Sequence, residues 1–262
     1  MRDLVATRAP DLLDRCVELV GEDPFARVDE STRFAQPAIF CASLAAWEAA
    51  GLEPGAAAGH SLGELAALTA AGVLAREDAL ELVVLRGRLM AEADPDGSMI
   101  ALIGGTPEDA QAVAERSGVT VANDNAPGQI VLSGPREALA RAEEAARGLG
   151  RRTLPVDVAG AFHSPSMRPA MAPLRAALDA VAISEPRFPV ISCATTQPFA
   201  DVRAELTEAL VRPVRWRETM LVLHAAGVRD FVETGPGTLL ARMGKRILPD
   251  CPVRALEEHA HA

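Results

Sequence analysis

Apolar residues recur at helical spacing along much of the chain. Apolar positions three or four residues apart share one face of a helix, which then packs against a core. This spacing, together with strong helix formers, predicts helices over 11–20, 37–50, 62–71, 76–93, 166–181, 202–210, 216–226 and 238–247. Short apolar runs between them predict strands at 56–58, 190–193 and 230–233. Strands that alternate with helices favour a parallel sheet covered by helices on both faces.

A different pattern begins after the turn residues Pro95, Asp96 and Gly97. The next segment predicts a strand, a helix, two strands, a helix and a strand, at 99–103, 107–116, 119–122, 129–133, 136–149 and 153–158. This order is that of the ferredoxin-like split βαβ motif. We therefore expect a small ferredoxin-like α+β subdomain over 97–158, inserted into a large α/β subdomain formed by 1–96 and 159–262.

Composition narrows the functional classes. The chain of 262 residues is 49% hydrophobic and 24% charged, which is typical of a globular protein. Its net charge of -10, with Lys245 as the only lysine, argues against binding to nucleic acid. No run of about 18 apolar residues predicts a membrane span, and the first residues lack the charged-then-apolar order of a signal peptide. These features predict a cytoplasmic protein that does not bind a membrane.

The cysteines give no sign of a metal site. They are far apart and form no CxxC pair, so neither a zinc site nor a disulfide framework is indicated. We expect buried, small hydrophobic residues at all four positions, which are Cys16, Cys41, Cys193 and Cys251. No metal or cofactor is expected from this pattern.

Candidate chemistry begins at Ser61. Residues 59–63 read Gly-His-Ser-Leu-Gly and fit the G-x-S-x-G nucleophile elbow, a strained strand-to-helix turn that presents the serine hydroxyl above a sheet. The strand predicted before it and the helix predicted after it supply the required context. Small residues on both sides of the serine are expected to be a steric requirement. The elbow makes the large subdomain hydrolase-like, whereas an ordinary turn serine is the alternative.

A serine hydroxyl needs a base within hydrogen-bond reach, usually a histidine. Of the five histidines, two lie in the C-terminal tail, one lies within a predicted helix and one flanks the serine, namely His259, His261, His224 and His60. His163 is the remaining candidate. It lies in a loop after the strand that closes the small subdomain, although a structural histidine is the alternative.

Several segments together resemble the malonyl-CoA:acyl carrier protein transacylases and the related acyltransferase domains of polyketide synthases. They occur in the family's order and at compatible spacing. The matching segments are 36–38 (QPA), 59–64 (GHSLGE), 86–90 (RGRLM), 123–134 (NDNAPGQIVLSG), 160–167 (GAFHSPSM) and 233–237 (ETGPG). A set of segments in order is far more specific than any one of them.

The resemblance implies catalytic roles for three residues. Ser61 is expected to be the nucleophile and His163 the base, with a main-chain carbonyl rather than an acid orienting the histidine. The backbone N–H of Leu62, at the start of the helix, is expected to stabilise the oxyanion. The reaction would be ping-pong, through an acyl group carried on Ser61.

The resemblance also implies a substrate. Arg86 is expected to pair with the carboxylate of a malonyl group, because a planar guanidinium can donate two parallel hydrogen bonds to it. Phe162 resembles the AFH pattern of malonyl-selecting domains, where a ring would crowd an α-methyl branch. Met90 and His60 complete the expected binding residues. Malonyl-CoA would be the donor, and no cofactor is needed beyond the phosphopantetheine carried by the partner.

The implied partner is an acyl carrier protein of fatty acid or polyketide synthesis, and we expect this protein to be a monomer. An acidic carrier would need a local arginine patch on this acidic chain. Two clusters are candidates, namely Arg141, Arg147, Arg151 and Arg152, and Arg212, Arg215 and Arg217. Ordinary solvated faces are the alternative.

Two features depart from the family's pattern. The family opens with an apolar strand that ends in a GQG turn, whose glutamine backbone supplies a second oxyanion donor, whereas residues 1–9 resemble the stretch that comes after this turn. We interpret this as a misplaced start codon and expect the upstream reading frame to encode the strand and the turn. Ala209 stands where the family usually has Gln or Asn, but the expected role belongs to a backbone carbonyl, which alanine retains.

Two other functions stay open at this point. A hydrolase of acyl thioesters would share Ser61 and His163 but admit water, and Arg86 speaks against it. The second is an inactive homologue that binds a carrier protein and lacks the N-terminal oxyanion loop.

Overall fold

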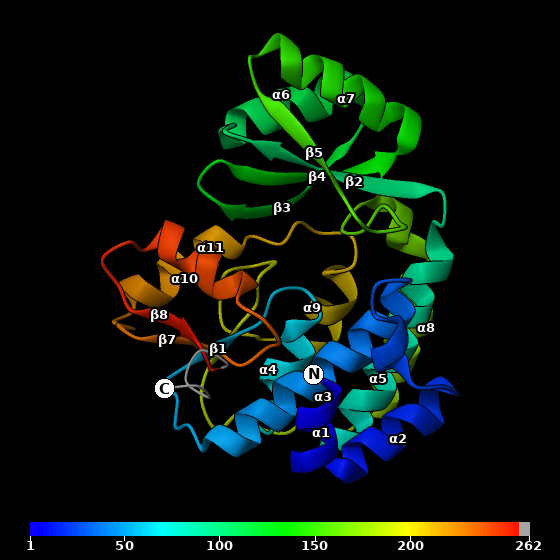
Figure 1. The fold of residues 1–262 in the computed structure, drawn as a ribbon, viewed down its shortest axis with the longest axis vertical. Helices are drawn as coiled ribbons and strands as arrows, with labels where there is room; N and C mark the ends of the chain where they lie inside the picture. Colours follow the sequence, from blue (N-terminus) through cyan, green and yellow to red (C-terminus); the bar gives the residue numbers. More distant parts are fainter. Residues whose placement is uncertain (257–262) are drawn as a thin grey trace.

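The computed structural model describes residues 1–256, and Figure 1 shows a larger lower part with a smaller part above it. The helices of the larger part are α1 (Arg2–Arg8), α2 (Pro10–Val20), α3 (Thr32–Ala50), α4 (Gly63–Ala70), α5 (Arg76–Ala93), α8 (Arg168–Ala180), α9 (Val202–Glu208), α10 (Trp216–Ala225) and α11 (Leu239–Ile247). Short 3-10 helices lie at Pro24–Arg27 and Pro165–Met167. Every helix predicted for this part from the apolar spacing is present.

Two differences from the predicted helices have local causes. Helix α3 begins at Thr32, ahead of the predicted residue 37, because the Ser31 side chain caps it by accepting from Arg33 N. Pro37 therefore lies inside the helix rather than at its start. Helix α1 was not predicted, since its seven residues bury only Val5 and show no clear period.

The strands of the larger part form two parallel ladders. Strand β1 (Ala57–Ala58) pairs with β6 (Val190–Ile191), and β7 (Phe231–Glu233) pairs with β8 (Val253–Ala255). Parallel pairing is confirmed, but within residues 1–256 the two ladders are separate rather than one continuous sheet. Strand β8 was not predicted, because three residues are too few for a period. The separation leaves room for a large cavity between the ladders.

The smaller part is a four-stranded antiparallel sheet with two helices. Its elements are β2 (Gly97–Ile103), α6 (Pro107–Ser117), β3 (Thr120–Ala126), β4 (Gln129–Pro135), α7 (Arg136–Gly148) and β5 (Arg152–Val156). The strand order β3-β4-β2-β5 and the connection order are those of the ferredoxin-like motif. The α/β fold with a ferredoxin-like insertion is therefore confirmed.

The two parts meet along strand β3. Its residue Asn123 forms a parallel bridge with Val214, and Val214 N donates to Ala122 O at 2.8 Å. Helices α10 and α11 also contact β3. The small part therefore rests on the loop that precedes α10, and Figure 1 shows it above α10 and α11.

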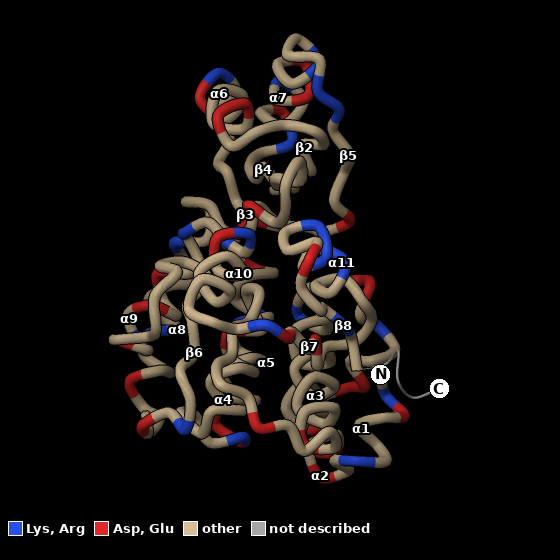
Figure 2. Tube along the Cα trace, turned by 90° about the vertical axis from the view of Figure 1, so that its left-hand side faces the viewer, with Lys and Arg blue, Asp and Glu red and all other residues tan. Residues whose placement is uncertain are grey.

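Charged residues of both signs are spread over the outer helices of both parts (Figure 2). Helix α11 is an exception, because its only charged residues are basic, namely Arg242, Lys245 and Arg246. All four cysteines are buried free thiols, as predicted. Across residues 1–256, no helix is long and apolar enough to cross a membrane, and no cluster of side chains is suited to hold a metal ion.

Candidate active site

Ser61 lies in the turn between β1 and α4. Its φ of 53° is in the left-handed region, which residues other than glycine rarely adopt, and this marks a strained turn. Gly59 makes the turn possible, because a Cβ there would lie 1.8 Å from the backbone carbon of Gly63. A Cβ on Gly63 itself would meet no atom within 4 Å. The expectation that small residues are sterically required on both sides is therefore correct for Gly59 and wrong for Gly63.

His163 lies directly beside the serine. Ser61 Oγ donates to His163 Nε2 at 2.8 Å. On the other side of the ring, Nδ1 lies 2.9 Å from Ala209 O and 3.1 Å from Arg212 O. Carbonyl oxygens only accept, so the proton must be on Nδ1, which leaves Nε2 free to accept the serine proton. The arrangement suits a general base.

Arg86 comes from the middle of α5 and points at the same hydroxyl. Its side chain is only 5% exposed. Nη2 donates to Ser61 Oγ at 3.0 Å, and Nη1 donates to the Gln36 amide oxygen at 2.5 Å. Within residues 1–256 these are its hydrogen-bond acceptors, and no carboxylate is among them. A buried guanidinium that hydrogen-bonds no carboxylate of the described chain can bind an anion.

Burial shifts the pKa values of His163, Arg86 and Glu64, which lie around Ser61. Desolvation first, and then the Arg86 charge, lower the pKa of His163 to about 3, against the raising effect of its two carbonyl contacts. Desolvation lowers the pKa of Arg86 to about 10, while Glu64 opposes the shift. Desolvation raises the pKa of Glu64 to about 7. His163 is therefore neutral and Arg86 charged at neutral pH.

The other predicted residues lie around the same cavity. Phe162 is buried against it, and Gly160 makes room for the ring, because a Cβ there would lie 2.4 Å from Phe162 Cε1. Met90 is also buried, and its sulfur accepts from Gln36 Nε2 at 3.4 Å. Leu62 is the N-cap residue of α4, and no acceptor in residues 1–256 binds its backbone N–H.

His60 lines the same cavity as Ser61 and His163 but is hydrogen-bonded to the small part of the molecule. Its Nε2 lies 2.8 Å from the Asn125 amide oxygen, to which it donates, and its ring tilts against Trp216 at 5.7 Å between centroids. Burial lowers the pKa of His60, so the ring is neutral. Since Asn125 belongs to β3, this contact joins the elbow to the small part of the molecule.

The sequence prediction assigned no role to three residues that hold the site. Gln36 binds Arg86, Asn125 binds His60, and Glu64 accepts from the backbone of Cys193. All three stand inside the segments that carried the family resemblance, so the signal was present. What was missing was the partner of each side chain, which only the fold provides.

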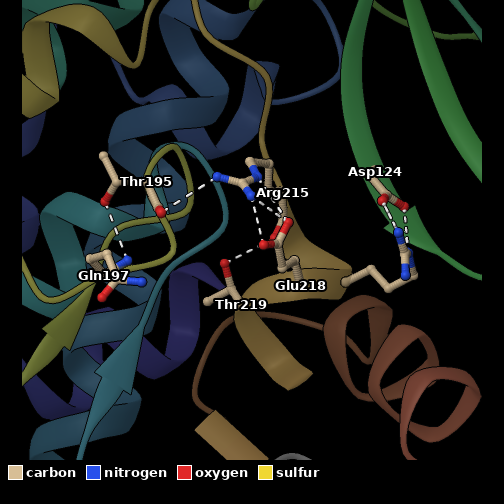
Figure 3. A network of polar contacts seen from close by, with 7 residues as sticks. Asp124, Thr195, Gln197, Arg215, Glu218 and Thr219 are labelled. Atoms are coloured by element: carbon tan, nitrogen blue, oxygen red, sulfur yellow. Dashed lines mark hydrogen bonds and ion pairs between the residues drawn. The ribbon is translucent and has the colours of Figure 1, made fainter. Parts of the chain in front are cut away.

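The second predicted arginine cluster is largely committed to ion pairs. Figure 3 shows Arg215 bound to Glu218 and to the Thr195 carbonyl. Arg217 binds the carboxylate of Asp124. Arg212 pairs with Glu208. In the first cluster, Arg151 pairs with Asp109. Arg151, Arg212, Arg215 and Arg217 therefore bind the molecule's own carboxylates, while Arg141 donates to the carbonyls of Glu137 and Ser117.

A cavity of about 840 Å³ opens in front of Ser61. It is lined by residues of both parallel ladders, by α3 and by β3, and Arg86 and His163 are among its lining residues. Its walls are mostly apolar, with a few polar groups that converge on the serine, which is typical of a substrate site. The histidines His259 and His261 lie outside the described residues.

Comparisons with known proteins bear on what this site does. Residues 17–257 match the sequence profile described as the acyl transferase domain. This chain belongs to the acyl transferase domain family. The resemblance inferred from the six sequence segments is thereby confirmed.

The relatives of this acyl transferase domain cover most of its length. It is 40% identical over 227 residues to the malonyl CoA-acyl carrier protein transacylase of Bacillus subtilis (strain 168). The aligned region covers 81% of this chain and 72% of that protein. The structure of the malonyl CoA-acyl carrier protein transacylase from Coxiella burnetii matches with a TM-score of 0.89 and 33% identity, over 97% of this chain and 86% of that one. A third relative is a malonyl-transacylase in complex with its type II PKS acyl-carrier protein, with a TM-score of 0.86, 34% identity and coverage of 97% and 89%.

Proposed function

We propose that this acyl transferase domain moves a malonyl group from coenzyme A to the phosphopantetheine thiol of an acyl carrier protein, for fatty acid or polyketide synthesis. One observation carries the proposal: the Ser61 hydroxyl lies between a neutral base, His163 Nε2 at 2.8 Å, and a buried cation, Arg86 Nη2 at 3.0 Å. The names of its relatives support the same donor and acceptor.

In the first half of the reaction His163 takes the Ser61 proton while the serine oxygen attacks the thioester carbonyl. The Leu62 N–H, unpaired among residues 1–256, points from the start of α4 and supplies a donor for the oxyanion that forms. The tetrahedral species collapses with loss of the coenzyme A thiol, which takes the proton from His163. The malonyl group is then an ester on Ser61.

Arg86 selects the acyl group and also assists the base. A malonyl carboxylate would accept from Arg86, and so would neutralise the charge that helps to lower the pKa of His163. A proton on His163 then costs less free energy when the substrate carries a carboxylate. A neutral acyl group leaves the buried charge unpaired and the base weak, so the preference for malonyl arises from both binding and chemistry.

In the second half the carrier's thiol attacks the Ser61 ester, with His163 accepting the thiol proton and Ser61 recovering its own. The apolar cavity favours a thiol on a long arm over water, which would release malonate instead. Incubation with malonyl-CoA and a holo carrier protein tests this distinction. We expect malonyl-carrier as the main product in a chromatographic assay, whereas free malonate with no malonyl-carrier would show a hydrolase.

A further inference from the structure

Glu64 is a buried carboxylate that the proposed reaction does not use. It stands in the first turn of α4, directly after the elbow, and its side chain is 2% exposed. Its Oε1 accepts from the backbone N–H of Cys193 at 2.7 Å. Burial of a carboxylate is costly unless its hydrogen bonds compensate, and the Cys193 contact is the first of these, ahead of the Arg86 charge and a hydrogen bond with the Ser192 side chain.

Cys193 makes three contacts that join separate segments. Its N–H donates to Glu64, its Sγ donates to Gly59 O at 2.9 Å, and its carbonyl accepts from Arg215 N at 2.8 Å. The first two contacts lie on either side of Ser61 in the sequence. One residue thus holds both ends of the strained elbow.

The third contact of Cys193 leads to the base. Arg215 comes just after the segment whose Arg212 carbonyl lies 3.1 Å from His163 Nδ1. The same segment is fixed on its other side to β3, through Val214 N and Ala122 O at 2.8 Å, and the Arg215 side chain is fixed to Glu218 (Figure 3). The nucleophile and the carbonyl that orients the base are therefore attached to each other through residue 193.

We infer that Glu64 is a positioning residue: by accepting from Cys193 N–H, its carboxylate fixes the Ser61 elbow against the loop that holds the orienting carbonyl of His163. The inference rests on the proposed function, because it concerns the alignment of Ser61 and His163. An error of about 1 Å in such an alignment costs on the order of 100-fold in rate.

The role needs an acceptor and not a charge. Arg86 and Glu205 are the charged groups whose fields reach Glu64, and burial raises its pKa to about 7. A protonated carboxyl keeps one carbonyl oxygen that can accept from Cys193, and so does a glutamine amide. Glu64→Gln should therefore preserve the link, Glu64→Ala should remove it, and Glu64→Asp should weaken it because the shorter side chain does not reach as far.

The matched control is Leu68→Ala. Leu68 lies one turn further along the same helix, is 1% exposed and does not line the cavity, so its truncation lowers stability without touching the link. All variants are tested for thermal unfolding, for kcat and KM with malonyl-CoA and a holo carrier, and for the rate at which a fluorophosphonate labels Ser61. The last probe reports the nucleophile without any malonyl chemistry.

We expect Glu64→Ala to slow both labelling and kcat by about 10- to 100-fold while KM changes less than about threefold. Glu64→Gln should stay within about threefold of the wild type from pH 6 to 8, and so should Leu68→Ala despite its lower melting temperature. If Glu64→Ala does not fold, Glu64→Asp carries the test, with an expected loss of about tenfold.

Two results would overturn the positioning role. One is a Glu64→Ala or Glu64→Asp variant whose Ser61 is labelled at the wild-type rate. The other is a Glu64→Gln variant as slow as Glu64→Ala, which would make the charge the important property. A wild-type protein whose Ser61 is labelled but transfers no malonyl would instead contradict the proposed function and leave the labelling comparison valid.

Discussion

The two halves of the candidate dyad are held in opposite ways. Ser61 is placed by its immediate neighbours, since strand β1, Gly59 and helix α4 together force the strained turn. His163 has a matching φ of 54°, but its ring is oriented by the carbonyls of Ala209 and Arg212, far along the chain. The turn at the nucleophile is therefore formed by local geometry and then fixed by the contacts of Cys193 with Gly59 and Glu64, whereas the base is oriented only by carbonyls distant in the sequence.

This difference explains which features a sequence can reveal. A local turn imposes residue types, such as the glycine at 59, where a side chain cannot fit. A carbonyl acceptor imposes none, because every residue has one, and so Ala209 can occupy its position without a polar side chain. Single substitutions should therefore reduce activity strongly where the turn requires a glycine and weakly where only a backbone carbonyl is used.

The largest effects should come from removing either member of the dyad. Ser61→Ala and His163→Ala are each expected to lower kcat by on the order of 10⁵- to 10⁶-fold, because each removes the same covalent step. The double variant should be no slower than either single one. Additive losses in single-turnover transfer assays would mean that the two residues act independently.

The next largest effect should distinguish the two elbow glycines. Gly59→Ala introduces an atom 1.8 Å from the Gly63 backbone, so the elbow must open, and we expect at least about a 100-fold loss of Ser61 labelling. Gly63→Ala meets no protein atom and should keep its fold and its fluorophosphonate reactivity. Equal damage from both substitutions, measured by labelling and thermal unfolding, would refute the steric account of the turn.

Arg86 binds the nucleophile Ser61 but makes no hydrogen bond to the base in residues 1–256, and its removal should change specificity more than reactivity. Arg86→Ala should lower kcat/KM for malonyl-CoA by about 10- to 100-fold, the value of a buried charged hydrogen bond, and spare acetyl-CoA. Arg86→Lys should recover little, because an ammonium lacks the planar pair of donors. A parallel loss for both acyl groups would argue against the carboxylate role.

The pH dependence of Ser61 labelling should report the environment of the base. Because the pKa of His163 is lowered to about 3, the ring stays neutral as the pH falls from 7 to 5, and labelling should persist there and be lost only as the pH approaches 3. Arg86→Ala removes one cause of the shift and should move the acid limb upward, towards 6.5. A wild-type limb already at 6.5, with circular dichroism unchanged, would contradict this electrostatic description.

The lowered pKa of His163 also makes the stability of the protein depend on pH. Between pH 6.5 and about 3 the unfolded chain binds a proton at residue 163 that the folded chain does not, so this group makes the protein less stable as the pH falls. At pH 5 the difference is about 2 kcal/mol. Urea unfolding should therefore show that His163→Ala loses less stability than the wild type between pH 7 and pH 5.

The smallest effect should be at Ala209. Its carbonyl accepts from His163 Nδ1, and a side-chain change leaves that atom in place. Ala209→Ser should keep kcat within about threefold of the wild type. A much larger loss, with the melting temperature unchanged, would mean that the side chain takes part in the site.

The sequence predicted the small part of the molecule well, because its strands and helices have clear periods and its order is a known motif. In the larger part it missed α1 and β8, which are too short for a period, and it did not show that β1 and β7 belong to separate ladders. Ladder pairing is a long-range property, and β1 finds its partner β6 only in the folded chain.

For the site, as for the fold, the sequence predicted local features but not long-range contacts. The positions of Ser61, His163 and Arg86 were evident from recognisable segments, and the structure brings the three within hydrogen-bond distance. The contacts of Gln36, Glu64 and Asn125 were not, since each joins elements far apart in the sequence. The residues of a segment could be read, but their contacts could not.

The most direct test of the central claim is the mass of the protein after brief exposure to malonyl-CoA. We expect one malonyl group on Ser61, mapped by peptide mass spectrometry, absent in Ser61→Ala and removed when a holo carrier protein is added. A wild-type protein that carries no adduct, or an adduct that persists in Ser61→Ala, would contradict a malonyl-enzyme formed on Ser61.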